Sequence, residues 1–173
     1  MAWPLALFWV FGGVAIASAL LCVTRRSAVA SALWLVVTLF QVAALFVLLD
    51  AEFIAVLQVL VYAGAIMVVF LFVIMLLNLG HPGPSDIRGP FGLGVGALLA
   101  GLLGLKLAGL ARAVPPAELT LAPGALENLT STQGLVGVVA RPLFATYLLP
   151  FEIASILLLA AIVGAVVLAK REL

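Results

Sequence analysis

One segment, residues 52–78, constrains what this chain can fold into more than any other. Its sequence is E-F-I-A-V-L-Q-V-L-V-Y-A-G-A-I-M-V-V-F-L-F-V-I-M-L-L-N, which is apolar and long enough to cross a bilayer as a helix. Two polar and three small side chains lie near its middle: Gln58 and Tyr62, then Ala63, Gly64 and Ala65. Hydrocarbon contains no water to satisfy polar groups or a loosened backbone, so such residues need protein neighbours. We therefore expect a helix that is buried among others and is deformable.

Composition extends this conclusion to the whole chain. Of the 173 residues, 66% are hydrophobic and 9% are charged, whereas about 25% are charged in a soluble domain. The sequence therefore predicts an integral membrane protein. A net charge of +1 gives no basis for nucleic-acid binding, which needs concentrated Lys and Arg. A single cysteine, Cys22, excludes an internal disulfide and a multi-cysteine metal or iron–sulfur site within this chain.

Five apolar runs are long enough to span a bilayer, and together they predict an all-α integral membrane fold. We expect one membrane domain, 1–173, with five transmembrane helices at roughly 3–23, 29–49, 53–77, 91–111 and 148–169. Proline and glycine interrupt the connection 112–142, which predicts a long surface loop containing a short interfacial or re-entrant piece.

The distribution of Lys and Arg predicts the orientation, because these residues gather on the cytoplasmic side. With the N-terminus outside, the inner side collects five of them: Arg25, Arg26, Arg88, Lys170 and Arg171. The outer side then has three at most. We therefore expect the N-terminus outside and the C-terminus in the cytoplasm, in a multi-pass protein of the cell membrane.

Small residues recur every fourth position on the last two predicted helices. The first ladder consists of Gly92, Gly96, Ala100, Gly104 and Ala108, and the second consists of Ala161, Ala165 and Ala169, with Ala160 and Gly164 as a further pair at the same spacing. This spacing places small side chains on one helix face, where another backbone can approach closely. The ladders serve either packing within this chain or packing against partner subunits.

A proton path of the chain's own is not evident. Proton relays need ionisable groups at depth, and no predicted span has a carboxylate or lysine clearly at its centre. Glu52 lies at the outer end of the third helix. Glu152 is interfacial if the last helix begins near Pro150, and about 14 Å deep if it begins after Pro142. The single histidine, His81, has no acidic or cysteine cluster around it, and no enzymatic motif is present. We expect no active site, cofactor or metal in this chain.

Tyr62 is the polar residue placed deepest. It lies ten residues after Glu52, or about 15 Å along a helix, so its hydroxyl needs a partner inside the protein. Gln58, four residues earlier, shares its face and is a candidate. A distorted backbone at Gly64 is a second expectation, because π-bulges arise in such places and concentrate at functional sites. A tyrosine that is hydrogen-bonded only for packing is the simpler alternative.

Two segments resemble the J-type membrane subunit of bacterial proton-pumping NADH:quinone oxidoreductase (respiratory complex I), the counterpart of mitochondrial NADH dehydrogenase subunit 6. They are 57–78, containing V-Y-A-G-A, and 147–169, which begins Y-L-L-P-F-E-I-A-S. The resemblance implies a hetero-oligomer with other membrane and peripheral-arm subunits, in which quinone reduction drives proton translocation. FMN, iron–sulfur clusters and quinone would lie in those partners, so this chain would be a non-catalytic subunit.

The family resemblance also implies a mechanism for the third helix. A π-bulge around residues 62–68 would convert to regular α-helix and so open or close a water or proton path. Gly64 would permit the twist, and apolar residues such as Ile66 and Val68 would exclude water. Gln58, Glu52 and Glu152 would give polar support. The alternatives are a sister complex (ferredoxin-, F420- or hydrogen-linked, or a cation antiporter) and a purely structural membrane scaffold.

Overall fold

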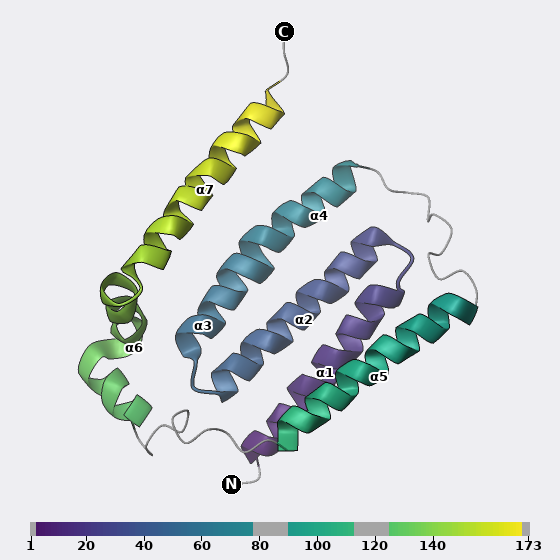
Figure 1. Ribbon diagram of the computed structural model, residues 1–173, viewed down its shortest axis with the longest axis horizontal. Coiled ribbons are helices and arrows are strands. Elements are labelled where there is room, and N and C mark those ends of the chain that lie inside the picture. The colour runs from purple at the N-terminus through teal and green to yellow at the C-terminus, as the bar shows by residue number, and fades with distance from the viewer. Residues whose placement is uncertain (1–2, 78–89, 113–124, 171–173) are drawn as a thin grey trace. The chain divides into compact units, whose positions relative to one another are not determined.

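The computed structural model describes residues 3–77, 90–112 and 125–170, and every regular element in these ranges is a helix (Figure 1). The chain divides into two compact units, Met1–Pro115 and Pro116–Leu173, where the sequence predicted a single domain. His81 lies outside the described residues. Each unit is therefore considered by itself.

Helix α2 is central to the first unit, because it contacts α1 on one side and the third span on the other (Figure 1). The third span is continuous but consists of three segments, α3, η1 and α4. The bounds are α1 Trp3–Thr24, α2 Ala28–Leu48, α3 Glu52–Leu57, η1 Gln58–Ile66, α4 Met67–Leu76 and α5 Pro90–Arg112.

Hydroxyl groups join α1 to α2 inside the apolar contact. The Ser18 side chain is only 2% exposed, and its Oγ lies 2.9 Å from Oγ1 of Thr38. Each hydroxyl also reaches a carbonyl of its own helix, Val14 for Ser18 and Trp34 for Thr38. Each hydroxyl has one proton, so one of them donates to the hydroxyl on the other helix, and that second hydroxyl donates to a carbonyl of its own helix. Nearer the turn, Ser31 Oγ donates to the carbonyl of Cys22.

The second unit contains α6, Ala125–Ala145, and α7, Leu148–Ala169. The sequence predicted a long loop over 112–142, and this prediction is wrong where the chain forms α6. Residues 125–133 contain neither Pro nor Gly, so nothing interrupts a helix until Gly134, which has φ 72° and ψ 160° and kinks it. The left-handed φ at this kink favours glycine. After α6, the N–H groups of Thr146 and Tyr147 both donate to the carbonyl of Pro142, at 2.9 Å, and α7 follows.

Four of the described helices are long and apolar enough to cross a membrane: Trp3–Thr24, Ala28–Leu48, Glu52–Leu76 and Leu148–Ala169. They match four of the five predicted spans. The remaining predicted span, 91–111, corresponds to α5, whose apolar part within the described residues is shorter, Gly94–Leu110. The many glycines of α5 add little to its mean hydropathy. A fifth membrane span therefore stays a prediction.

The Ser18–Thr38 contact predicts a measurable coupling between α1 and α2. In a double-mutant cycle with Ser18→Ala and Thr38→Val, the interaction energy should be about 0.6 kcal/mol and no more than about 1.7 kcal/mol, the range found for interhelical hydrogen bonds in a membrane protein. Unfolding of the purified protein in mixed micelles measures it. Thr24, whose hydroxyl bonds its own helix at Leu20, is the control, and Ser18→Ala with Thr24→Val should be additive. Additivity of the first pair would contradict the bond.

A π-helical segment beside an apolar groove

The middle of the third span has π-helical winding over η1, Gln58–Ile66. At its end the N–H of Met67 reaches back five residues to the carbonyl of Tyr62. Such winding is rare and is seen mostly as single-turn bulges, frequently at functional sites. The segment begins four residues before the 62–68 range that the family resemblance implied. It lies within a single 25-residue apolar stretch, so both ends of the π-segment continue directly into α-helix.

Gly64 explains why the π-winding can form here. A Cβ added at this position would lie 3.1 Å from the carbonyl oxygen of Val59, which is closer than nine in ten real Cβ contacts. The oxygen belongs to the backbone and cannot swing aside as a flexible side chain would. Glycine removes that contact at the place where the wider turn brings residues five apart together.

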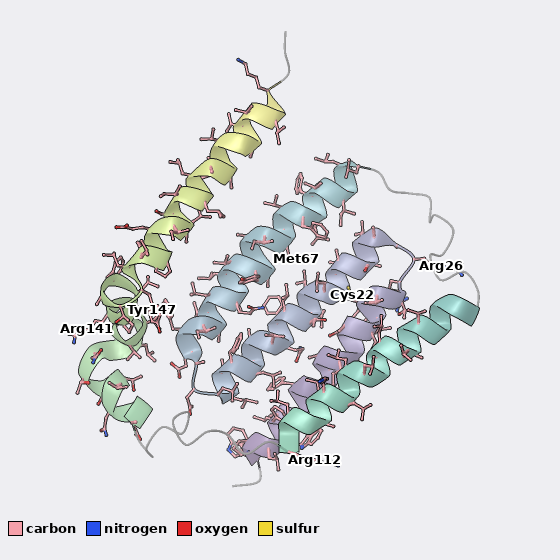
Figure 2. All side chains as sticks on the ribbon, viewed as in Figure 1. Cys22, Arg26, Met67, Arg112, Arg141 and Tyr147 are labelled. Carbon is pink, nitrogen blue, oxygen red and sulfur yellow. The ribbon has the colours of Figure 1, made fainter. Side chains whose placement is uncertain are left out.

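The π-winding also keeps one row of residues against α2. Ala55, Ala63 and Met67 are 4–5% exposed, and α2 is the only other described helix that η1 and α4 contact outside their own span. Met67 lies on the inward side (Figure 2). In a regular α-helix, four residues make slightly more than one full turn. Over the three four-residue steps from residue 55 to residue 67, this excess would place the two side chains about 120° apart around the helix axis. A turn closed by i→i+5 bonds holds more residues and offsets this drift.

The opposite side of the span is open. Tyr62 is 53% exposed, and large apolar residues near it are similarly exposed: Ile66, Val68, Val69 and Phe70. Ala65 is exposed as well, whereas Gln58 is half-buried. Within the described residues neither Tyr62 nor Gln58 makes a side-chain hydrogen bond. The suggested pairing of these two residues is therefore absent, and any partner of the Tyr62 hydroxyl lies outside the described part of the chain.

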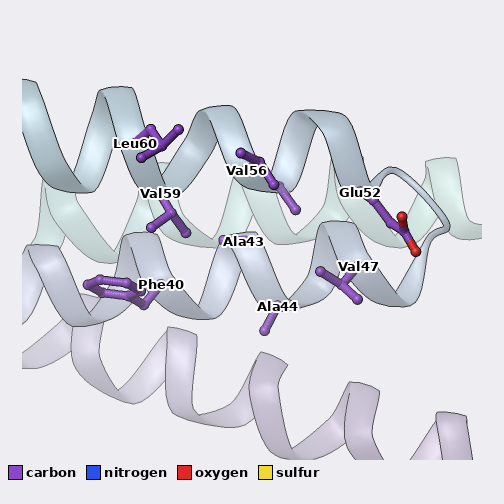
Figure 3. A pocket seen from close by; sticks show the side chains of 9 residues that line it. Phe40, Ala43, Ala44, Val47, Glu52, Val56, Val59 and Leu60 are labelled. Atoms are coloured by element: carbon purple, nitrogen blue, oxygen red, sulfur yellow. The ribbon is translucent and has the colours of Figure 1, made fainter. Parts of the chain in front are cut away.

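An apolar groove of about 640 Å³ opens between α2 and the first half of the third span (Figure 3). Its α2 side includes Phe40, Ala43 and Val47, and the third span supplies Val56, Val59 and Leu60. Glu52 lies at one end and is its only charged lining residue. Two of the lining residues, Val59 and Leu60, belong to the π-segment.

Glu152 lies in the first turns of the last helix, and its depth in the membrane stays a prediction. Helix α7 begins at Leu148, so Glu152 is about 6 Å from the helix start. The residue is exposed, and its backbone carbonyl accepts a bond of 2.7 Å from Ser155 Oγ. Among the described residues, no group of three or more His, Cys, Asp or Glu is arranged to hold a metal ion.

Within its own unit, each small-residue ladder is uncovered by the described residues. A Cβ added at Gly92, Gly96, Gly104 or Gly164 would meet nothing within 4 Å, and the alanines of the two ladders are exposed: Ala100, Ala108, Ala161 and Ala165. Neither face therefore has a partner among the described residues of its own unit.

Sequence reasoning missed the Ser18–Thr38 contact, whose only signal was a hydroxyl on each of two apolar helices.

Comparison with known proteins identifies the family. Residues 18–168 match the family described as NADH-ubiquinone/plastoquinone oxidoreductase chain 6. The chain therefore belongs to the NADH-ubiquinone/plastoquinone oxidoreductase chain 6 family. This membership confirms the resemblance inferred from the sequence. With four helices able to span a membrane, the family member is a multi-pass membrane protein.

Three relatives illustrate the breadth of this family. The chain is 36% identical to NADH-quinone oxidoreductase subunit J of Rhodobacter capsulatus, over 95% of this chain and 81% of the relative. It is 37% identical to subunit J of Pseudomonas aeruginosa, over 95% and 96%. Identity to the NAD(P)H-quinone oxidoreductase chain 6 of Leptolyngbya boryana is 39%, over 95% and 79%.

The contact at Gly64 predicts that Gly64→Ala favours α-helical over π-helical winding. In the π-form the added Cβ would lie 3.1 Å from the Val59 carbonyl oxygen, a contact that penalises this winding. A penalty of about 1 kcal/mol would raise the ratio of α to π populations about fivefold. Solid-state NMR of the labelled protein in bilayers measures it through backbone shifts of residues 58–66. Gly13→Ala, where a Cβ meets nothing within 4 Å, is the control. An unchanged π-segment in Gly64→Ala would contradict this account.

Proposed function

We propose that this chain is a membrane-arm subunit of proton-translocating NADH:quinone oxidoreductase, in which the third span gates a water or proton path. Family membership and the names of the relatives support the first part. The observation that carries the second part is the π-segment Gln58–Ile66 in the middle of an apolar span.

The gate would act by rotation. Converting one π-turn to α-helix changes the helical phase by one residue, or about 100°, between α3 and α4. Ile66, Val68 and Phe70 are exposed on this chain, so they would line a path shared with a neighbouring subunit. Hydrophobic constrictions open and close by wetting and dewetting. In one winding these side chains would exclude water, and in the other they would turn aside.

This chain would supply the gate, and its partner subunits would supply the groups that carry protons and electrons. Proton relays need ionisable groups at depth, and between Glu52 and the end of the third span the sequence has none apart from Tyr62. Carboxylates of partner subunits would therefore carry the protons. FMN, iron–sulfur clusters and quinone would be bound by partners, and this subunit would have no active site. In the bacterial cell membrane its N-terminus would be outside and its C-terminus cytoplasmic, consistent with the Lys and Arg count.

A sister complex with the same membrane module is the second candidate. It would be ferredoxin-, F420- or hydrogen-linked, or a cation antiporter, whereas the names of the relatives give only NADH or NAD(P)H as donor. This chain would not touch the electron donor, so its own residues discriminate weakly between donors.

Affinity purification of the tagged chain from its native membrane in mild detergent tests the assembly. We expect co-purification of many subunits with NADH:quinone activity. A large assembly without NADH oxidation would favour the sister complex. Elution of the chain alone would contradict both candidates.

The gate predicts that Gly64→Val lowers NADH-driven proton pumping more than it lowers assembly. A branched side chain against the Val59 carbonyl would hold the span in one winding, so pumping per unit of NADH oxidised should fall at least severalfold. Inverted membrane vesicles give the pumping, and native gels give the assembled fraction. Gly13→Val, on a face with nothing within 4 Å, controls for a bulky residue in a span. Equal losses of pumping and assembly would mean that Gly64 only packs.

The uncovered ladder of α5 predicts a partner contact. Gly96→Leu would keep a partner backbone from approaching, because close packing of small residues holds membrane helices together. The yield of the co-purified assembly should fall at least twofold. Leu98→Ala, at a position 64% exposed on the same helix, should leave the yield unchanged. An equal yield from Gly96→Leu would assign this face to lipid.

A further inference from the structure

We propose that the second half of α6, residues 135–145, lies along the membrane surface and binds the boundary between the headgroups and the acyl chains of the lipid bilayer. The gate does not use this segment, so the proposal holds for either candidate complex. It assigns one face of a short helix as the binding surface and the bilayer itself as the partner.

The polarity of α6 changes at its kink. Before Gly134, six of the nine residues 125–133 are polar, whereas Arg141 is the only polar residue among the eleven of 135–145. Gly134 has a left-handed φ of 72°, so one helical run ends there and the next begins in a new direction. The kink therefore separates a part of α6 that suits water from a part that does not.

The connection to α7 places the second half of α6 at the edge of the membrane. Only Thr146 and Tyr147 separate the two helices, and the N–H groups of both donate to the carbonyl of Pro142. The Phe144 ring meets Phe151 of α7 edge to face, with 5.0 Å between the ring centroids. Helix α7 has 22 residues, so it is about 33 Å long, close to the about 30 Å of a hydrocarbon core. Its first residue, and the helix tied to it, would therefore lie at a membrane boundary.

Length and direction both favour a position along the membrane surface. In Figure 1 the end of α6 that joins α7 is seen almost end-on, whereas α7 lies across the view. A helix that turns sharply away from the end of a span runs along the membrane plane. Eleven residues make about 16 Å of helix, which is about half of what a crossing needs. The segment is therefore too short to cross and is turned away from the crossing direction.

One side of this short helix is aliphatic, and the other side has its only charge. Four aliphatic side chains lie within an arc of about 100° around the helix axis: Leu135, Val136, Val139 and Leu143. Arg141 lies opposite the middle of this arc, between Gly137 and Ala145. Leu135 and Val136 are 45% and 59% exposed, so the described residues of this unit leave the aliphatic side open.

The bilayer is the partner that suits such a helix. Interfacial helices insert an apolar face at the acyl boundary and keep basic side chains among the headgroups. Arg141 has no ion pair among the described residues, and Tyr147, in the turn before α7, is of a type enriched at membrane–water interfaces. The aliphatic side has none of the aromatic residues that are enriched in the cores of protein interfaces. Lipid would cover this side where the chain already enters the membrane.

Fluorescence quenching in the assembly, purified from native membranes into nanodiscs, tests this position. A fluorescent non-natural amino acid is introduced by amber suppression in place of Val136. Ser131, in the polar half of α6, is the reference position for water, and Leu158, near the middle of α7 and 63% exposed, is the reference for deep hydrocarbon. The quenchers are iodide in water and lipids brominated either near the headgroup or near the chain end. Only chains that co-purify in the assembly are compared.

We expect bromines near the headgroup to quench the reporter at Val136 at least about twofold more than bromines near the chain end, because interfacial helices insert only about 5–10 Å. The reporter at Leu158 should show the reverse order, and iodide should quench the reporter at Ser131 most. Three results at Val136 would each overturn the proposal. They are strong quenching by iodide, stronger quenching by the deep bromines, and no quenching by any of these agents, which would indicate cover by a protein.

Two glutamine variants test which side of the helix faces the lipid. Val139→Gln places an amide on the aliphatic side, so bromine quenching of the Val136 reporter should fall by about twofold or more. Arg141→Gln places the same side chain among headgroups and water, and quenching should stay close to that of the unmodified segment. Equal effects of the two variants would contradict an oriented helix and overturn the proposal.

Discussion

The backbone of a membrane span has to satisfy its N–H and C=O groups within the span itself, because the hydrocarbon around it contains no water. The third span meets this requirement with two windings, α-helical at its ends and π-helical over Gln58–Ile66. Both windings pair backbone groups internally, so a change from one to the other breaks the pairing only locally. The choice between the two windings therefore depends on side-chain packing and on the contact between Gly64 and the Val59 carbonyl. Both contribute little free energy, so contacts with neighbouring helices can outweigh them.

In the proposed gate, α2 would be the fixed reference for the rotating segment. A buried hydroxyl contact ties α2 to α1, while Ala43 on α2 and Ala55 and Ala63 on the third span are the small residues at which its other side packs. Few other side chains are buried in the described residues, namely Ser18, Ala32 and Met67. The chain therefore has a thin core organised around one helix, and most of its apolar surface needs lipid or partner subunits to cover it.

Hydropathy was sufficient to predict four spans, because each is a long apolar run between turn residues or charges. It failed at 125–133, because the Pro and Gly residues that predicted a loop over 112–142 lie outside this stretch, and nothing interrupts a helix before Gly134. Depth arguments identified Tyr62 as unusual, yet its 53% exposure shows that depth in the membrane and burial within one chain are different quantities. The Ser18–Thr38 contact was not predictable, since helix periodicity does not reveal which hydroxyls of two spans will face each other.

The groove and the π-segment share Val59 and Leu60, and this overlap has a thermodynamic consequence. Straightening the helix would rotate one part of the span relative to the other by about 100°, so an occupant touching both α3 and η1 would meet different surfaces in the two windings. A ligand shifts a conformational equilibrium only by its difference in affinity for the two states, and the coupling is reciprocal. An occupant that fits the groove better in the π-form would favour that form, and straightening the helix would loosen that occupant.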